Sequence, residues 1–204
     1  LPAGPFAILP LAGRGRRLPH RSSIVWTEDA SRAAALLAGD PAVLLEALSA
    51  RFGPEWGALD LETPLRAHPL GVGLARRFVG ERVALLGDAA HVVHPLAGQG
   101  LNLALGDAAS LAEHILAEVR LGLDPGAPAP LAAYERDRRV HAVALAGLTD
   151  GLNRLFSRDG LALRAVRDLG LGLVDRSGPV KRELASAAAG TDRLAPRLMR
   201  GLAI

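Results

Sequence analysis

The stretch of sequence that decides the fold runs from residue 82 to residue 102 and reads RVALLGDAAHVVHPLAGQGLN. Its apolar start, Val83 to Leu86, ends at Gly87, which is typical of a short strand buried on both faces. Asp88 follows at the carboxyl end of that strand, where α/β sheets bind their ligands. A loop rich in glycine and proline then leads into a helix. This order predicts a cofactor-binding unit.

The loop before the helix carries Gly98 and Gly100, which allow the backbone to approach a ligand closely. The free N–H groups at the start of the helix point toward such a ligand. Apolar residues at spacings of three and four then predict a buried stripe along one helix, made of Leu101, Leu105, Ala108, Ala112, Ile115 and Val119. Gly122 and Pro125 predict where this helix ends.

These residues resemble the second FAD motif of the class A flavin-dependent aromatic hydroxylases. The matching residues are Gly87-Asp88-Ala89-Ala90-His91, His94-Pro95, Gly98-Gln99-Gly100-Leu101-Asn102 and Asp107. The His-Pro-x-x-Gly-Gln-Gly-x-Asn form is similar to the ubiquinone-biosynthesis branch of that family. The resemblance extends over nearly the whole chain, through Phe6 to Leu11, Ser23 to Thr27, Tyr134-Glu135 with Arg138, and Thr149 to Leu152 ahead of Leu155-Phe156.

The resemblance implies FAD as the cofactor and gives individual residues a role in binding it. Asp88, next to Gly87, would accept hydrogen bonds from the ribityl chain. Pro95 would lie beside the flavin ring. The backbone at the helix start would meet the pyrimidine edge of the flavin and stabilise negative charge on the reduced ring; its residues are Gly98, Gln99, Gly100, Leu101 and Asn102. No catalytic side chain and no metal ligand follows from the resemblance.

The resemblance also implies an activity, that of an FAD-dependent monooxygenase. Reduced FAD and O2 would form a flavin peroxide that hydroxylates the aromatic ring of a prenylated phenol in ubiquinone biosynthesis. NAD(P)H or another reductant would supply the electrons. Two alternatives stay open. One is a flavin hydroxylase of another small aromatic substrate, and the other is a non-catalytic flavoprotein fragment that acts as an assembly or membrane-docking partner.

The expected fold class is α/β, with part of a Rossmann-like FAD-binding domain, a β-sheet substrate domain and C-terminal helices. Residues 1–80 are expected to end the substrate-binding domain, residues 81–123 to form the FAD-binding strand, loop and helix, and residues 124–204 to be helical. The family's Gly-x-Gly-x-x-Gly fingerprint for the ADP half of FAD is absent from the sequence. We therefore expect the chain to be the C-terminal half of a longer hydroxylase, and to be inactive by itself.

Further elements are predicted on either side of the central unit. The β-prone runs Phe6 to Leu11 and Ser23 to Thr27 predict a hairpin with a long loop. Asp40-Pro41 predicts a helix start, because Asp caps a helix and Pro fits its first turn. The sequence predicts one long helix over Leu131 to Phe156 and another over Leu161 to Val174.

Three polar residues of the motif receive no FAD-binding role from the resemblance. His91 and His94 are three residues apart, but a metal site would need further ligands, so a structural or flavin-adjacent role is favoured. Asp107 falls inside the predicted helix, where Asp is mildly unfavourable. It either bonds a neighbouring loop or faces solvent.

The composition excludes several classes of protein. Of the 204 residues, 50% are hydrophobic and 22% charged, which is typical of a globular chain. Aromatic residues are only 3%, which argues against a platform that stacks single-stranded nucleic acid. The net charge is +3 and the basic residues are scattered, so no nucleic-acid partner is expected. The absence of cysteine excludes disulfides and thiol catalysis within this chain.

Expected partners are a lipophilic phenolic substrate and O2, with a biosynthetic complex or a homo-oligomer left open. The expected location is the cytoplasm, or the inner membrane as a peripheral protein. The chain's tail mixes leucine and arginine, at Arg193, Leu194, Arg197, Leu198, Arg200 and Leu202. Such a segment either lies on an anionic membrane surface or packs as an amphipathic tail on protein.

Overall fold

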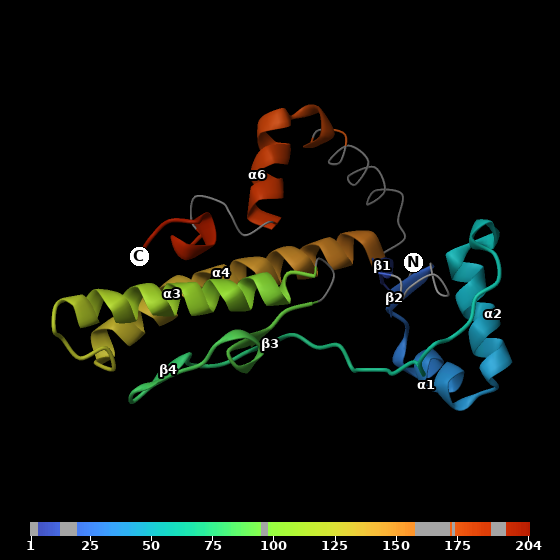
Figure 1. The fold of residues 1–204 in the computed structure, drawn as a ribbon, viewed down its shortest axis with the longest axis horizontal. Coiled ribbons are helices and arrows are strands. Elements are labelled where there is room, and N and C mark those ends of the chain that lie inside the picture. Colours follow the sequence, from blue (N-terminus) through green and yellow to red (C-terminus); the bar gives the residue numbers. More distant parts are fainter. Residues whose placement is uncertain (1–3, 13–19, 95–97, 158–171, 173, 189–194) are drawn as a thin grey trace. The chain divides into compact units, whose positions relative to one another are not determined.

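The computed structural model describes residues 4–12, 20–94, 98–157, 172, 174–188 and 195–204, and the chain forms two compact units (Figure 1). The first unit is Leu1–Pro69 and the second is Leu70–Ile204. Helices and strands occur in both, as an α/β chain requires. The division falls after Pro69, so residues 70–80, which the sequence grouped with the first part, belong to the second unit.

The first unit consists of a hairpin and two helices. Strands β1 (Phe6–Leu11) and β2 (Arg21–Trp26) pair antiparallel, as the sequence predicted. Helices α1 (Ala30–Ala38) and α2 (Pro41–Phe52) follow, and a short 3-10 turn (Pro54–Trp56) comes after them.

The predicted start of α2 is confirmed in detail. The Asp40 carboxylate accepts a hydrogen bond from the backbone N–H of Ala42 at 2.8 Å, which caps the helix. Leu44 and Leu48 form its buried face. The ring of Phe52 meets the ring of Phe6 edge-on at 5.7 Å, which joins α2 to the hairpin.

The second unit places four short strands and a turn beside two long helices. In chain order its elements are β3 (Gly73–Leu74), β4 (Val79–Gly80), β5 (Val83–Ala84), the 3-10 turn η3 (Gly87–Ala89), β6 (His91–Val92), α3 (Gly100–Arg120), α4 (Pro128–Ser157), α6 (Gly178–Ala188) and the 3-10 turn η5 (Leu198–Arg200). β3 pairs with β6 and β4 with β5, both antiparallel. α3 and α4 run side by side (Figure 1).

The strand expected at the start of the central motif differs from its prediction. It is only two residues long as β5, and Val83 is 55% exposed rather than buried on both faces. Among the described residues β5 pairs with β4 alone, so it belongs to a two-stranded ribbon and not to a wider sheet. Its inner side packs on a small core made of Phe78, Ala90, Leu103, Tyr134 and Ala142.

The apolar stripe predicted for α3 is wrong. Leu101 is 71% exposed, and Leu105 and Val119 are each 51% exposed. The buried positions are instead Leu103, Gly106, Asp107, Ala109 and Ser110. Small and polar residues are buried because α3 meets α4 closely there and an ion pair crosses the contact.

The ends of the helices agree better with the sequence. α3 ends at Arg120, and Gly122 follows with a φ of +70°, as its predicted stop requires. α4 covers the predicted long helix and begins three residues earlier, at Pro128. The helix predicted over residues 161–174 lies almost wholly outside the described residues. No helix in the described part of the chain is long and apolar enough to cross a bilayer.

The last residues of the chain return to α3. The backbone N–H of Leu198 donates to the carboxylate of Glu113 at 3.3 Å. Arg120 donates to the backbone carbonyl of Ile204. Residues 195–204 therefore contact their own protein through η5, while Arg193 and Leu194 of the same tail lie outside the described residues.

Candidate functional site

The first part of the candidate site is the turn η3, which contains Gly87 and Asp88. Gly87 is buried and has a φ of +56°, a conformation that favours glycine. A Cβ at this position would lie 3.0 Å from the Cβ of Ala104 on α3. A 2.8 Å hydrogen bond from Ala90 N to Gly87 O closes the turn. Asp88 is exposed, so the turn presents its carboxylate at the surface.

The N-terminus of α3 forms the second part of the site. Gly98 has a φ of +61°, and among the described residues a Cβ on either Gly98 or Gly100 would meet nothing within 4 Å. Gln99 directly precedes the helix, and its side-chain oxygen accepts a 3.2 Å hydrogen bond from the Asn102 side chain. Leu101 projects outward on the first turn. The backbone at these two glycines is therefore open to the approach of a ligand.

A buried polar atom belongs to His94, shortly before Gly98 in the sequence. The Nδ1 atom of His94 is buried and has no hydrogen-bond partner among the described residues. Such an atom costs free energy unless a ligand or water satisfies it. Pro95 follows it in the sequence and lies outside the described residues. The open glycines and this unsatisfied nitrogen fit a polar planar cofactor such as FAD.

A buried carboxylate, that of Asp107, connects the turn to both long helices. Asp107 on α3 is fully buried and accepts hydrogen bonds from Gly87 N at 2.9 Å and from His91 Nε2 at 2.7 Å. Its other oxygen accepts from Arg138 Nε on α4 at 2.7 Å. Arg138 also donates to the backbone carbonyl of Leu103 at 3.3 Å. Of the two sequence alternatives, Asp107 therefore bonds a neighbouring loop.

The surroundings of Asp107 keep it ionised. Desolvation by burial opposes the charge, but hydrogen bonds from His91, Arg138 and Gly87 outweigh it, and the charge of Arg138 adds to them. The net result is a pKa of Asp107 below its ordinary value. Because the acceptor is a carboxylate, the Nε2 atom of His91 carries the proton and donates.

The Tyr-Glu motif on α4 holds the segment that leads into the turn. Tyr134 is fully buried and donates to the backbone carbonyl of Leu85 at 2.7 Å. The backbone N–H of Phe78 donates to the Glu135 carboxylate at 2.7 Å. Burial, followed by the nearby charge of Asp107, raises the pKa of Tyr134 well above its ordinary value. Tyr134 and Glu135, which are part of the resemblance to the family, thus position the site and do not form its surface.

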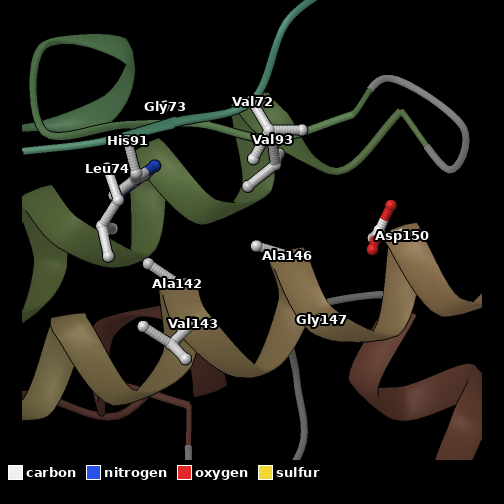
Figure 2. A pocket seen from close by; sticks show the side chains of 10 residues that line it. All are labelled: Val72, Gly73, Leu74, His91, Val93, Ala142, Val143, Ala146, Gly147 and Asp150. Atoms are coloured by element: carbon white, nitrogen blue, oxygen red, sulfur yellow. The ribbon is translucent and has the colours of Figure 1, made fainter.

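An apolar pocket lies beside this framework, between the β3 and β6 segments and α4. Figure 2 shows Val72 and Leu74 on the strand side facing Ala142 and Ala146 on the helix side. The cavity has a volume of about 470 Å³, within the range of small-molecule sites. His91 forms part of its lining together with Val93, Val143, Gly147, Gly73 and Asp150.

Among the described residues, the two histidines of the motif are not part of a cluster of metal ligands. His91 is paired with Asp107, which gives it a structural role next to the site. No group of three or more His, Cys, Asp or Glu side chains in the described ranges comes close enough to hold a metal ion.

Comparison with known proteins identifies the family. Residues 6–149 match the family of FAD binding domains, and the chain therefore belongs to that family. Within it, the chain is 47% identical to ubiquinone hydroxylase UbiL of Rhodospirillum rubrum, over 99% of this chain and 46% of that protein. It is 34% identical to the human ubiquinone biosynthesis monooxygenase COQ6, mitochondrial, over 92% of this chain and 46% of that protein.

The fold also has a solved relative. The structure of BexE, studied for oxidation during BE-7585A biosynthesis, matches with a TM-score of 0.59 and 25% identity over 93% of this chain and 37% of that one. The family match and the two relatives of ubiquinone biosynthesis confirm the resemblance to the ubiquinone branch of the flavin hydroxylases, and the family match confirms FAD as the cofactor. The chain spans about half the length of the curated relatives it matches.

Proposed function

We propose that this chain supplies the flavin-facing part of an FAD-dependent monooxygenase that hydroxylates a prenylated phenol in ubiquinone biosynthesis. One observation carries the proposal. An exposed carboxylate, Asp88, lies in the turn η3 directly after the buried Gly87, and the glycines at the start of α3 leave the backbone of that helix accessible. Turn, loop and helix start are the elements that the FAD motif requires.

Each part of the site has a task in this proposal. Asp88 and the backbone of Gly98 to Asn102 bind and orient the cofactor. The N–H groups at the start of α3 stabilise negative charge placed against them. The bound flavin, once reduced by NAD(P)H or another electron donor, supplies the chemistry with O2.

We further propose that the apolar pocket between β6 and α4 receives the lipophilic part of the substrate. Its walls are mostly aliphatic, with Val72, Leu74, Val93 and Ala146 among them. It also adjoins the segment that carries the cofactor turn, since His91 lines the pocket three residues after Asp88. An apolar pocket excludes water from a bound ring and its prenyl chain.

A second candidate is a flavin hydroxylase of a different aromatic substrate. The likeness to BexE over 93% of the chain favours it, because that protein is described in connection with oxidation in a different biosynthesis. The two candidates share the flavin site and differ only in the molecule that is hydroxylated.

The test uses the protein that carries this chain, purified as its natural host makes it. We expect flavin absorbance bands, and we expect Asp88→Ala to weaken FAD binding about ten- to hundredfold, the effect of losing hydrogen bonds to a charged group. With NAD(P)H and O2, the wild type should add one oxygen atom to a prenylated phenol, as measured by mass spectrometry.

The matched control is Asp60→Ala, which removes an exposed aspartate of the first unit. It should leave FAD binding unchanged. A protein that binds FAD and consumes O2 but hydroxylates only unprenylated aromatic compounds would favour the second candidate. A protein that cannot be loaded with FAD would overturn both.

A further inference from the structure

The Asp107 carboxylate accepts hydrogen bonds from three separate parts of the second unit. It lies on α3, and its donors are Gly87 of the turn, His91 of β6 and Arg138 of α4. All of the charged groups are buried: Asp107 is 0% exposed and Arg138 is 4% exposed. A buried ion pair of this kind is weak support for stability, because apolar residues can often replace it without loss. Its position suggests another role.

One contact of Asp107 reaches the backbone directly before the expected FAD ligand. The amide of Gly87 donates to the Asp107 carboxylate, and Asp88 is the next residue. Gly87 has a positive φ and lies against Ala104 of α3, so the turn has little freedom to move once that amide is held. Asp107 therefore restrains the backbone directly before Asp88.

The other contacts lead to the helix N-terminus. Arg138, held by Asp107, reaches the carbonyl of Leu103 in the first turn of α3. Gly106 makes this path possible, because a Cβ there would lie 2.8 Å from the Arg138 Nη2 atom. The same ion pair thus touches both elements that meet the flavin, namely the turn with Asp88 and the start of α3.

We propose that Asp107 and Arg138 are positioning residues that fix the Asp88 turn and the α3 N-terminus relative to each other, so that both meet one FAD molecule. This inference rests on the proposed function. It assigns to the two residues no contact with FAD or substrate.

The test compares Asp107→Asn with Glu118→Gln in the purified protein as its host makes it. Asparagine keeps the size of the side chain but cannot accept hydrogen bonds from all three donors. Glu118→Gln makes the same chemical change on the same helix, away from the site. We expect Asp107→Asn to weaken FAD binding at least tenfold in a fluorescence titration and to change the visible circular dichroism of bound FAD. Glu118→Gln should do neither.

A milder variant covers the case in which Asp107→Asn fails to fold. Arg138→Lys keeps a positive charge beside Asp107 but loses the planar fork that reaches Leu103 as well. We expect it to fold, to bind FAD at least threefold more weakly and to show the same change in visible circular dichroism. An affinity within twofold of wild type and an unchanged spectrum in Arg138→Lys would overturn the inference.

The two proposals fail in different ways. If wild type binds no FAD, the proposed function fails and this inference falls with it. If wild type binds FAD, Asp88→Ala weakens that binding, and the folded Asp107 and Arg138 variants bind FAD like wild type, only this inference is overturned.

Discussion

At the scale of single residues, the buried carboxylate of Asp107 holds the turn of the candidate site, a contact that the sequence pattern did not predict. The motif predicts Gly87 and Asp88 directly, because glycine permits the turn and the acid follows it. It does not predict that Asp107, 19 residues after Asp88, holds the amide of Gly87. An Asp among apolar helix residues has the same sequence signature whether it faces solvent or a buried arginine.

The lowered pKa of Asp107 predicts how the stability depends on pH. A group whose pKa is lower in the folded state than its unfolded value of about 3.9 stabilises the fold above that value. The contribution is lost as the pH falls through the folded pKa. Asp107→Asn should therefore lower the free energy of unfolding by about 3–5 kcal/mol at pH 7, the usual effect of breaking a buried pair. This difference from wild type should shrink below about pH 4.

Urea unfolding followed by helical circular dichroism from pH 7 to pH 3 measures this difference. Asp60→Asn, which changes an exposed aspartate, serves as the control and should track wild type throughout. A difference that stays constant over the whole pH range would show that the charge of Asp107 does not contribute.

At the scale of elements, α3 shows how a tertiary contact overrides an amphipathic pattern. The apolar stripe through Leu101 and Leu105 is exposed, while Gly106 and Asp107 face α4. Periodicity counts apolar side chains and cannot see an ion pair that crosses between two helices. Small residues at this contact leave room for the Arg138 side chain between the two helices. An apolar stripe in the sequence does not indicate that such room is needed.

Two helix-interior glycines should respond in opposite ways to the same substitution. Gly147→Ala in α4 has open space around the new Cβ and should raise the stability by up to about 1 kcal/mol through helix propensity. Gly106→Ala in α3 should lower it, because the new Cβ lies 2.8 Å from Arg138 Nη2, and this buried guanidinium cannot move away without breaking its bonds to Asp107 and Leu103. The expected loss is about 1–3 kcal/mol, as for other overpacked cores. Urea unfolding of both variants measures the contrast, and a gain in Gly106→Ala would contradict the observed geometry.

At the scale of the whole molecule, the boundary between the two compact units falls in a segment that forms neither helix nor paired strand. Residues 57–72 are mostly extended and exposed, with prolines at positions 64 and 69. The division follows Pro69, and the strands β3 and β4 join the unit that carries the site. A helix-rich second unit with its own core is expected to keep its structure when this segment is cut.

Limited trypsin digestion tests this organisation. Arg66 lies exposed in the segment, and we expect cleavage after it to leave the fragment 67–204 folded. Mass spectrometry identifies the cut, and circular dichroism of the isolated fragment measures its helices. Arg66→Gln should remove this cut and no other. Loss of the helical signal in the fragment would show that the second unit depends on the first.

The sequence by itself determined the local features of this protein. It predicted the β1–β2 hairpin, the capped start of α2 at Asp40, the stop at Gly122 and the FAD motif around Asp88. Each of these depends on residues close together in the chain, through backbone conformation, capping or a turn.

The tertiary structure alone decided which face of α3 is buried, which groups hold Asp107, and where the units divide. These features depend on Arg138 and on strands distant in the sequence, and the energy of a buried charge is set by its neighbours in space. The resemblance of the motif therefore predicted which residues bind the flavin. Only the fold showed how those residues are held.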